Sequence, residues 1–326
     1  MTERRRELRD ARHGLRSLIL GTLLLPLLVI ACGEHNPRTN TPTSGRMVLF
    51  VEAPYAPLFT RFAEQFGTRV GSATIEVRPV SARAGVEALI NGYLADTAHP
   101  DTAVSYGLII ARRLLDDEQK LLVDRGIDNL LKETLIAYDA LALGVANDSP
   151  IEEATVEGLR SALALADPNG NDLIAGGPTT SVRFHFPSPN SSSYAYVRDS
   201  LLSDSASPRA PAIWHDDPAA MLAAVTAGQG IAIDGWYTLS DSTDGIKTLR
   251  IGGGSSEGDG RPVRAHTTSL VMKLYPMKLP IVGYTLGATS SLGYGFLRWV
   301  GLSEGPQREL ATIGLEPENV RFEFTR

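Results

Sequence analysis

The hydrophobic and polar positions of this chain follow a repeating order of strand, loop and helix. An apolar run at 47–51 predicts a strand, and the alternating positions at 73–79 predict a second one. Between them, apolar residues recur at helical spacing over 58–66, and a second helix is expected at 86–94. Strands that alternate with helices in this way indicate an α/β fold with parallel strands.

The same order continues through the rest of the chain. Residues 101–105 (DTAVS) are interpreted as the end of a third strand, and the acidic start of 114–123 favours a helix there. The later elements are expected as helices at 155–164, 194–202, 217–227, 290–300 and 303–313 and as strands at 230–236 and 279–284. The glycine-rich segment 251–260 lacks the Lys of a phosphate-cradling loop, so a surface loop is predicted.

The stretch 135–148 (LIAYDALALGVAND) organises the rest of the chain. It is a short apolar run followed by Pro150, which favours a buried strand over a helix. The sequence on each side of it reads as a separate α/β unit. We therefore expect this strand to cross from one lobe to another.

The N-terminal 31 residues have the pattern of a secretion signal. Six Arg residues precede the apolar run 18–30, which is shorter than the roughly 20 residues that a membrane span needs. Cys32 is the only cysteine, which excludes an intramolecular disulfide. The residues before it, Leu28-Val29-Ile30-Ala31, resemble a bacterial lipobox, and the resemblance implies a diacylglyceryl thioether on Cys32. The alternative is a buried cysteine at the end of a plain signal anchor.

Residues 32–46 are rich in Pro, Thr, Asn and Ser and are expected to form a flexible tether.

The charge of the mature chain bears on its partners. The whole chain has a net charge of −6, and without the leader it carries 25 basic and 34 acidic residues. This balance argues against a nucleic-acid partner. It does not exclude an anionic ligand, because helix N-termini and backbone N–H groups bind anions without net charge.

Several ordered segments together resemble the phosphate-type (PstS-like) substrate-binding proteins of ABC importers. The segments are Ala56-Pro57-Leu58, Ala84-Gly85-Val86, DTAVS at 101–105, IAYDALA at 136–142, SSSY at 191–194, GIAIDG at 230–235 and the stretch from Tyr275-Pro276 to Gln307. Their order and spacing cover residues 47 to about 316. The resemblance identifies the chain as a lipoprotein form of this family.

The family implies a type II periplasmic-binding-protein fold. In that fold two α/β lobes, each a mixed or parallel sheet flanked by helices, are joined by a two-stranded hinge. On this basis 1–31 is the signal peptide, 32–46 is the tether, 47–138 with 243–326 is lobe 1, and 139–242 is lobe 2. The family also implies a binding component with no enzymatic activity and no cofactor, an ABC permease as partner, an extracytoplasmic location held by the lipid anchor, and a monomeric state.

The resemblance implies a phosphate-like oxyanion held between the lobes by loops and helix N-termini. The candidate ligand-binding residues are Ala53, Tyr55, Ser81, Ala82, Arg83, Asp101, Ser105, Asp139, Ser191, Ser192 and Ser193. A carboxylate such as Asp101 or Asp139 could accept the proton of HPO₄²⁻ and so reject sulfate.

The binding loops depart from the family pattern. Glu52 adds a negative charge near the expected anion, Pro54 removes a donor, and 187–190 lacks the usual Arg. Arg83 could replace that charge. Two functions therefore stay open: an importer component for phosphate or a related oxyanion, and a ligand-sensing or interaction lipoprotein with an altered or lost anion site.

Each candidate also has a purely structural interpretation. Ser191–Ser193 could be an ordinary N-cap run, and Asp101 and Ser105 could form a solvated strand end. Asp139 could cap the hinge and Arg83 could be a surface charge, while Tyr138 is expected in the hinge core.

Two other kinds of site are disfavoured. The sequence His215-Asp216-Asp217 is explained better by an Asp N-cap than by a metal site. A hydrolase with His185 and Ser191 would lack the Gly-x-Ser-x-Gly elbow.

Overall fold

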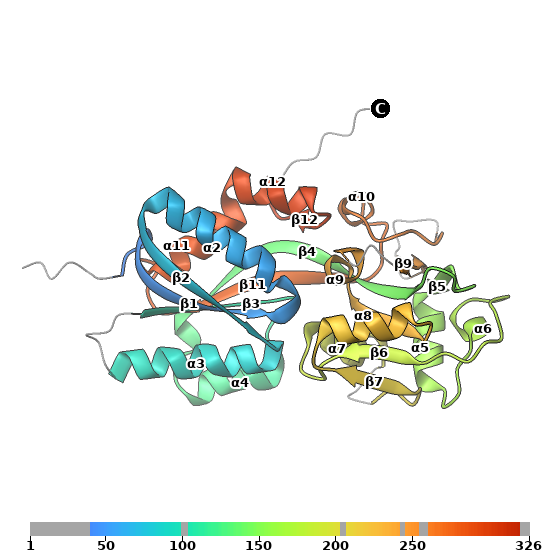
Figure 1. The fold of residues 1–326 in the computed structure, drawn as a ribbon. Coiled ribbons are helices and arrows are strands. Elements are labelled where there is room, and N and C mark those ends of the chain that lie inside the picture. The colour runs from blue at the N-terminus through green and yellow to red at the C-terminus, as the bar shows by residue number, and fades with distance from the viewer. Residues whose placement is uncertain (1–39, 99–103, 203–206, 242–244, 254–259, 320–326) are drawn as a thin grey trace, which may run out of the picture. The chain divides into compact units, whose positions relative to one another are not determined.

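The structure is a computed structural model that describes residues 40–98, 104–202, 207–241, 245–253 and 260–319. Residues from Asn40 onward form one compact unit (Figure 1). Its strands join in the order β2-β1-β3-β11-β4-β8-β6-β7, and β9 and β12 also pair with β4. The fold is the mixed α/β type expected from the sequence. Within the described residues, no helix is long and apolar enough to cross a membrane.

Strand β4 (Leu131–Ala146) is shared by both lobes, as the sequence predicts. Its first half pairs with β11 (Lys278–Leu286), whereas its second half pairs with β8 (Ile231–Gly235) and β9 (Ile246–Thr248). The burial pattern agrees with a strand in the interior of the fold, because nearly every residue from Ile136 onward is buried. Figure 1 shows β4 as the long green strand that runs between the two groups of helices.

Lobe 1 is built on parallel strands that lie next to one another. Strand β1 pairs in parallel with β2 and with β3, and β11 closes this half in antiparallel pairing with β3. The strands are β1 (Ser44–Glu52), β2 (Ser72–Val80) and β3 (Val104–Ile110). The helices are η1 (Ala53–Tyr55), α2 (Ala56–Val70), α3 (Ala82–Ala98), α4 (Asp116–Asp124), η3 (Asp128–Leu130), α11 (Leu292–Leu302) and α12 (Glu304–Thr312).

Helix α2 illustrates how the sequence sets these elements. Pro57 lies in its first turn, where a missing N–H costs nothing. Phe59, Phe62 and Phe66 are buried at helical spacing, and they form edge-to-face or tilted contacts with one another and with α11. The helix ends at Gly71, whose φ of 73° is the left-handed conformation that glycine adopts without steric cost.

Lobe 2 repeats the parallel arrangement on the other half of β4. Strand β6 (Phe184–Pro187) pairs in parallel with β8 and with β7 (Ala212–His215). A small second sheet joins β10 (Arg250–Gly252) to β5 (Glu153–Thr155). The helices are α5 (Val156–Ala164), α6 (Gly170–Leu173), α7 (Ser192–Tyr196), the π-helical turn η4 (Val197–Leu201), α8 (Pro218–Thr226) and α9 (Trp236–Asp241).

The chain returns from lobe 2 to lobe 1 after residue 243, which is the boundary expected from the sequence. Strands β9 and β10, at 246–252, pair with β4 and β5 on the lobe 2 side. The chain then passes through α10 (Thr267–Val271) and reaches β11, where the Leu141 N–H donates to the Met277 carbonyl. A final short strand, β12 (Glu316–Pro317), pairs with β4 at Tyr138 and Ala137.

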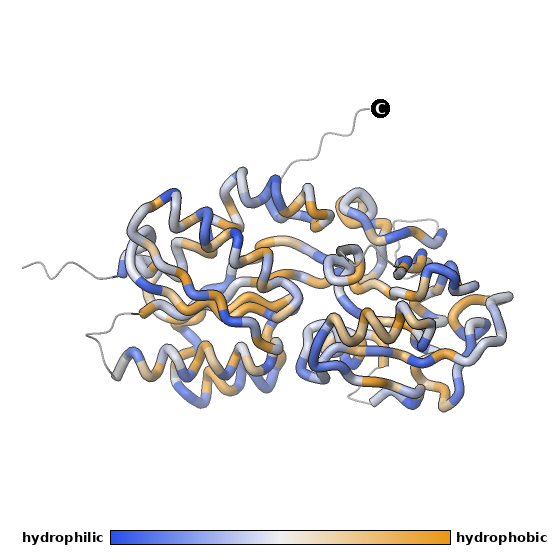
Figure 2. The backbone as a smooth tube through the Cα atoms, viewed as in Figure 1, coloured by the Kyte–Doolittle hydropathy of each residue, from blue (hydrophilic) through white to orange (hydrophobic). Residues whose placement is uncertain are grey.

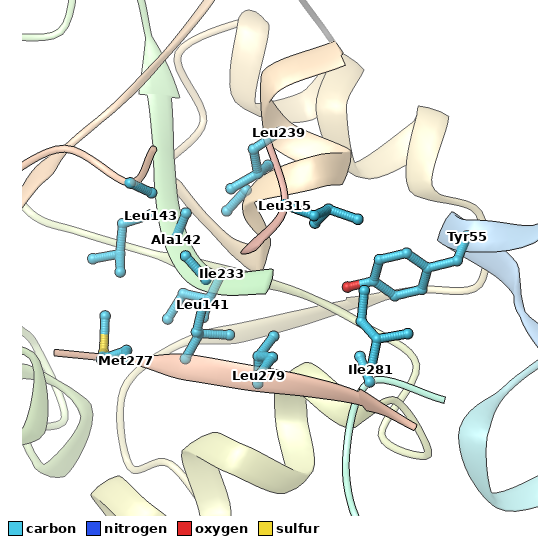
Figure 3. Packing of buried hydrophobic residues seen from close by; sticks show 14 of the residues in the cluster. Tyr55, Leu141, Ala142, Leu143, Ile233, Leu239, Met277, Leu279, Ile281 and Leu315 are labelled. Atoms are coloured by element: carbon cyan, nitrogen blue, oxygen red, sulfur yellow. The ribbon is translucent and has the colours of Figure 1, made fainter. Parts of the chain in front are cut away.

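The core follows the strands across both lobes. In Figure 2 the hydrophobic colour gathers along the central strands. One cluster of buried residues extends from Met47 on β1 through Leu141 on β4 to Phe186 on β6. Figure 3 shows its middle, where Leu141, Ile233 and Leu279 pack together around the crossing strand. A second cluster lies under α3 and α4.

Candidate functional site

The carboxyl ends of the parallel strands of both lobes meet at one small pocket. In an α/β sheet this edge is where ligands bind. The pocket has a volume of about 80 Å³ and is called the interlobe pocket below. From lobe 1 it is lined by Glu52, Ala53, Pro54, Val80 and Ser81, and from lobe 2 by Pro187, Ser188, Ser191, His215, Asp216, Pro218 and Asp234.

Glu52 joins the two lobes beside this pocket. It is the last residue of β1, and only 4% of its surface is exposed. Its Oε1 accepts a hydrogen bond from the Ser192 N–H at 2.7 Å, and its Oε2 accepts from the Ser192 hydroxyl at 2.6 Å and the Ala111 N–H at 2.9 Å. The carboxylate thus uses donors of the kind that would bind an oxyanion, one from lobe 1 and two from lobe 2.

The three predicted serines lie together, each with a different partner. Ser191 is the N-cap of α7, and its hydroxyl accepts from the Tyr194 N–H. Ser192 donates to Glu52, and the Ser193 hydroxyl donates to Asp234 Oδ1 at 2.5 Å. All three are buried, but only Ser191 lines the interlobe pocket.

Asp234 is a second buried carboxylate at this edge. It lies near the end of β8 with 3% of its surface exposed, and its Oδ2 has no hydrogen-bond partner. Burial raises the pKa of Asp234 to about 6; the Ser193 hydroxyl opposes the shift and the charge of Glu52 adds to it. The nearby Thr238 hydroxyl also lowers this pKa, although its Oγ1 makes no hydrogen bond of normal geometry.

Asp139 and Tyr55 meet at the hinge and not in the pocket. The Tyr55 hydroxyl donates to Asp139 Oδ2 at 2.7 Å, and the carboxylate also accepts from the Ala140 and Tyr237 N–H groups. Burial raises the pKa of Asp139 to about 7, although these donors favour its charged form. Burial and the charge of Asp139 raise the pKa of Tyr55 well above its usual value. Figure 3 shows Tyr55 reaching toward the packed side chains of the crossing strand.

Two histidines form a stacked pair behind the pocket. His185 Nε2 lies 3.1 Å from the Gln229 carbonyl, which can only accept, so Nε2 carries the proton. His185 Nδ1 therefore accepts from His215 Nε2, which lies 2.9 Å away. Burial, together with the neighbouring His215, lowers the pKa of His185. His215 is thus held by its Nε2 at the pocket wall.

Arg83 does not supply a charge to the interlobe pocket. Its guanidinium pairs with Asp117 and Glu87, and the Asp117 carboxylate raises its pKa. Its backbone N–H instead donates to the Asn190 carbonyl of lobe 2 at 3.2 Å. Ala82, before it, is the first residue of α3 and is buried. Arg83 thus connects the lobes through its main chain.

Ser105 lies away from the site. It is near the start of β3, paired with Met47 on β1, whereas the pocket lies at the other end of these strands near Glu52. Its hydroxyl donates to Asn40. The prediction was wrong because DTAVS was taken as the end of a strand, when the buried run Leu108–Ile110 that follows is its second half. Asp101 and Cys32 lie outside the described residues.

A larger hollow of about 830 Å³ is lined by residues 111–117, up to the start of α4, and by residues of α7 and η4. Most of its charged groups already have partners. Arg112, which is buried, makes a bidentate ion pair with Glu118 at 2.6 and 2.7 Å, and Arg198 pairs with Asp199. Residues of both lobes line this hollow as well, so convergence of the lobes does not decide between the two pockets. We place the candidate site in the smaller pocket because the parallel strands β1, β2, β6, β7 and β8 end there.

Sequence reasoning missed the roles of Glu52, Asp234 and His215. Glu52 was read as a charge repelling the ligand and not as an acceptor for the site's own donors. Asp234 and His215 lie at the carboxyl ends of parallel strands, which is the signal that could have found them. Among the described residues no group of three or more His, Cys, Asp or Glu side chains could hold a metal ion.

Comparisons with known proteins agree with this architecture. A family model, the PBP superfamily domain, matches residues 36–304. No curated protein matches the sequence. A solved substrate-binding protein from Clostridium perfringens, assigned to a phosphate ABC transporter and carrying bound phosphate, is similar with a TM-score of 0.63 and 18% identity, over 83% of this chain and 99% of that one.

Two further solved structures show how widely the fold is used. An ABC-type phosphate transport receptor from Vibrio cholerae has a TM-score of 0.57 and 16% identity, over 84% of this chain and 100% of that one. The regulatory domain of Synechocystis CcmR, in complex with 2-PG, has a TM-score of 0.51 and 14% identity, over 79% and 96%. These likenesses establish a fold that transport receptors and regulators share. Together with the family match, they show that the chain belongs to the PBP superfamily, with the two-lobed type II fold of PstS-like binding proteins.

Proposed function

We propose that this chain is an extracytoplasmic ligand-binding lipoprotein whose ligand lies in the interlobe pocket. The supporting observation is that both lobes contribute to this pocket, at the carboxyl ends of their parallel strands. A ligand there would contact both lobes at once, which is how binding energy can drive lobe closure.

One candidate role is the binding component of an ABC importer for phosphate or a related oxyanion. The fold likeness to the Clostridium perfringens and Vibrio cholerae proteins supports it. So do the hydroxyls of Ser81, Ser188 and Ser191 in the pocket lining, since serine hydroxyls can donate to an anion. A permease in the same membrane would be the partner.

The other candidate role is ligand sensing or interaction, with an altered anion site. The observation that favours it is the position of Glu52, whose carboxylate already accepts the Ser192 and Ala111 donors. An incoming oxyanion would have to displace a hydrogen-bonded carboxylate and approach Asp234 as well. We therefore favour a binding module in which Glu52 takes the place of the anion. The likeness to the Synechocystis regulatory domain shows that the fold is also found in regulators.

Native mass spectrometry and calorimetry separate the two candidates. Freshly purified protein containing residues 33–326, which retains the whole compact unit, is weighed intact so that a carried-over ligand identifies itself. It is then titrated with phosphate, sulfate and molybdate. Tight one-to-one binding of an oxyanion would establish the importer candidate and contradict the altered site, whereas no oxyanion binding is the result that we expect.

The lipid anchor has its own test. Mass analysis of the mature N-terminal peptide should show a diacylglyceryl-modified Cys32, and Cys32→Ala should release the protein from membranes. An unmodified Cys32 in membrane-bound protein would contradict the anchor and leave the pocket unaffected.

A further inference from the structure

The larger hollow of about 830 Å³ has the size of a site for an organic molecule. Pockets that bind such ligands have volumes of roughly 300–1,000 Å³. Lobe 1 lines it with residues 111–117, and lobe 2 with residues from 195–200. Leu279 and Pro280 complete the lining from β11, where this strand pairs with β4 at the hinge. In Figure 1, α4 and α7 lie on the facing sides of the two lobes.

Local structure on both walls is of a kind found at binding sites. On lobe 1, strand β3 ends at Ile110, so 111–117 is the segment that leaves the carboxyl end of a parallel strand. Ligands of α/β folds bind at this edge of a sheet. On lobe 2, helix α7 passes directly into the π-helical turn η4. Such turns are rare and frequently lie at functional sites.

The composition of the lining favours a ligand that carries both charges. The lining contains three arginines (112, 113 and 198) and three aspartates (116, 117 and 199), and six of its other residues are Ala, Leu or Pro. A ligand with a single charge would be attracted by half of the charged groups and repelled by the other half. A ligand with opposite charges and an apolar body would match the charged groups and the apolar surface together.

Three polar groups in this lining are open to a ligand. Asp116, exposed at the start of α4, has no ion pair among the described residues. Arg198 donates to Asp199 from Nε and Nη2, whereas its Nη1 has no partner in the described part of the chain. The hydroxyl of Tyr196, a partly exposed residue, likewise makes no hydrogen bond to another described residue. Lobe 1 therefore offers an acceptor for an ammonium group, and lobe 2 offers donors for a carboxylate.

We propose that the larger hollow is a second ligand site, which binds an amphipathic zwitterion of the size of a short peptide with free termini. The ammonium group lies against Asp116 and the carboxylate against Arg198. The apolar side chains of the peptide pack on Leu115 and Pro280, which are both partly exposed. The proposal does not depend on the ligand of the interlobe pocket, because the two linings share no residue.

The test is calorimetric titration of the protein (residues 33–326) with the dipeptide leucylleucine at neutral pH. Two blocked forms of the dipeptide are the matched control ligands. N-acetyl-leucylleucine lacks the ammonium group, and leucylleucine amide lacks the carboxylate. We expect saturable one-to-one binding of leucylleucine, and binding of each blocked form that is weaker by at least about threefold.

Two variants assign the two charges of the ligand. Asp116→Asn should weaken the binding of leucylleucine but not that of the acetylated form, which has no ammonium group to lose. Arg198→Gln should weaken the binding of leucylleucine but not that of the amide. The matched controls are Asp124→Asn, at the other end of α4, and Arg308→Gln on α12, which change exposed charges outside the hollow and should leave binding unchanged.

A third variant locates the site. Ser200 is exposed and lines the hollow, so Ser200→Trp should fill it without disturbing the core, and should abolish binding in protein whose circular dichroism is that of the wild type. No saturable binding of leucylleucine to the wild type, equal binding of the three dipeptide forms, or binding unaffected by Ser200→Trp would overturn the proposal.

The interlobe pocket is tested separately by Ala53→Leu, which changes an exposed residue of that lining. We expect it to leave leucylleucine binding unchanged. If Ala53→Leu blocks leucylleucine and Ser200→Trp does not, the dipeptide binds in the interlobe pocket and the second site is wrong. If leucylleucine fails to bind while a carried-over ligand is lost in Ala53→Leu, the second site is wrong and the proposed function stands.

Discussion

Glu52 on β1 and Ser192 on α7, 140 residues apart in sequence, are joined by two hydrogen bonds of 2.7 and 2.6 Å. The contact links the two lobes, and a third bond from Ala111 fixes the carboxylate on the lobe 1 side. In a fold built to hold a ligand between its lobes, a side chain of the protein occupies donors that a ligand could use.

Removing the Ser192 hydroxyl should weaken this link. Ser192→Ala deletes a hydrogen bond to a buried carboxylate, so we expect a loss of about 1.5–3 kcal/mol in the free energy of unfolding. Ser72→Ala, which removes an exposed hydroxyl that donates to the Thr43 carbonyl, is the control and should change stability by less than about 0.5 kcal/mol. Urea unfolding followed by circular dichroism measures both. Equal effects of the two substitutions would argue against a stabilising Glu52–Ser192 contact.

The buried carboxylate at the hinge predicts a stability that falls as pH rises. The unfolded chain releases the Asp139 proton near its usual pKa of 3.8, whereas the folded protein retains it up to about 7. The stabilisation of the folded state that comes from this raised pKa is therefore fully present below about pH 4, and it is lost as pH rises through 7. Asp234, with a pKa of about 6, acts in the same direction.

Asp139→Asn should flatten this dependence. Between pH 5 and pH 8 the free energy of unfolding of the wild-type protein should fall by on the order of 2 kcal/mol more than that of the variant. Urea midpoints at the two pH values measure this, with Asp124→Asn, an exposed partner of Lys120, as control. A variant with the same pH slope as the wild type would show that Asp139 titrates normally.

Gly235 should be intolerant of a side chain. A Cβ there would lie 2.6 Å from Asp139 Oδ2 and 2.8 Å from the Tyr55 hydroxyl, and would separate the hydrogen-bonded pair. We expect Gly235→Ala to destabilise the protein by about 1–3 kcal/mol. Gly305, inside α12, has open space around it, so Gly305→Ala should be neutral or stabilising by up to about 1 kcal/mol. Thermal unfolding measures the change in melting temperature of each variant. Equal changes for Gly235→Ala and Gly305→Ala would contradict the crowding at Gly235.

The fold could be predicted from the sequence because its signals are local and repeated. The buried run around Leu141 indicated the crossing strand, and the spacing of Phe59, Phe62 and Phe66 indicated α2. The loops at Ala53, Ser81 and Ser191 line one pocket, while their role in ligand binding stays a prediction. These features depend on periodicity and chain order, which a single sequence displays directly.

The site chemistry could not be predicted in the same way. Whether Glu52 faces a ligand or replaces one depends on Ser192, which is far away in sequence, and no spacing rule connects them. The guanidinium of Arg83 had an equally unforeseeable partner in Asp117. Ser105 was misplaced because a strand boundary is the least certain part of a sequence-based assignment, and a shift of a few residues moved it to the wrong end of β3.

The central claim is that the Glu52 carboxylate occupies the anion position between the lobes. Glu52→Ala leaves the buried Ser192 and Ala111 N–H groups without acceptors, at a cost of about 1–3 kcal/mol each. Acetate added from solution should then replace the lost carboxylate. The decisive measurement is the melting temperature of Glu52→Ala and of the wild type against acetate concentration, with chloride as the ionic-strength control. The account predicts a saturable rise for the variant and none for the wild type; the same response in both proteins would contradict it.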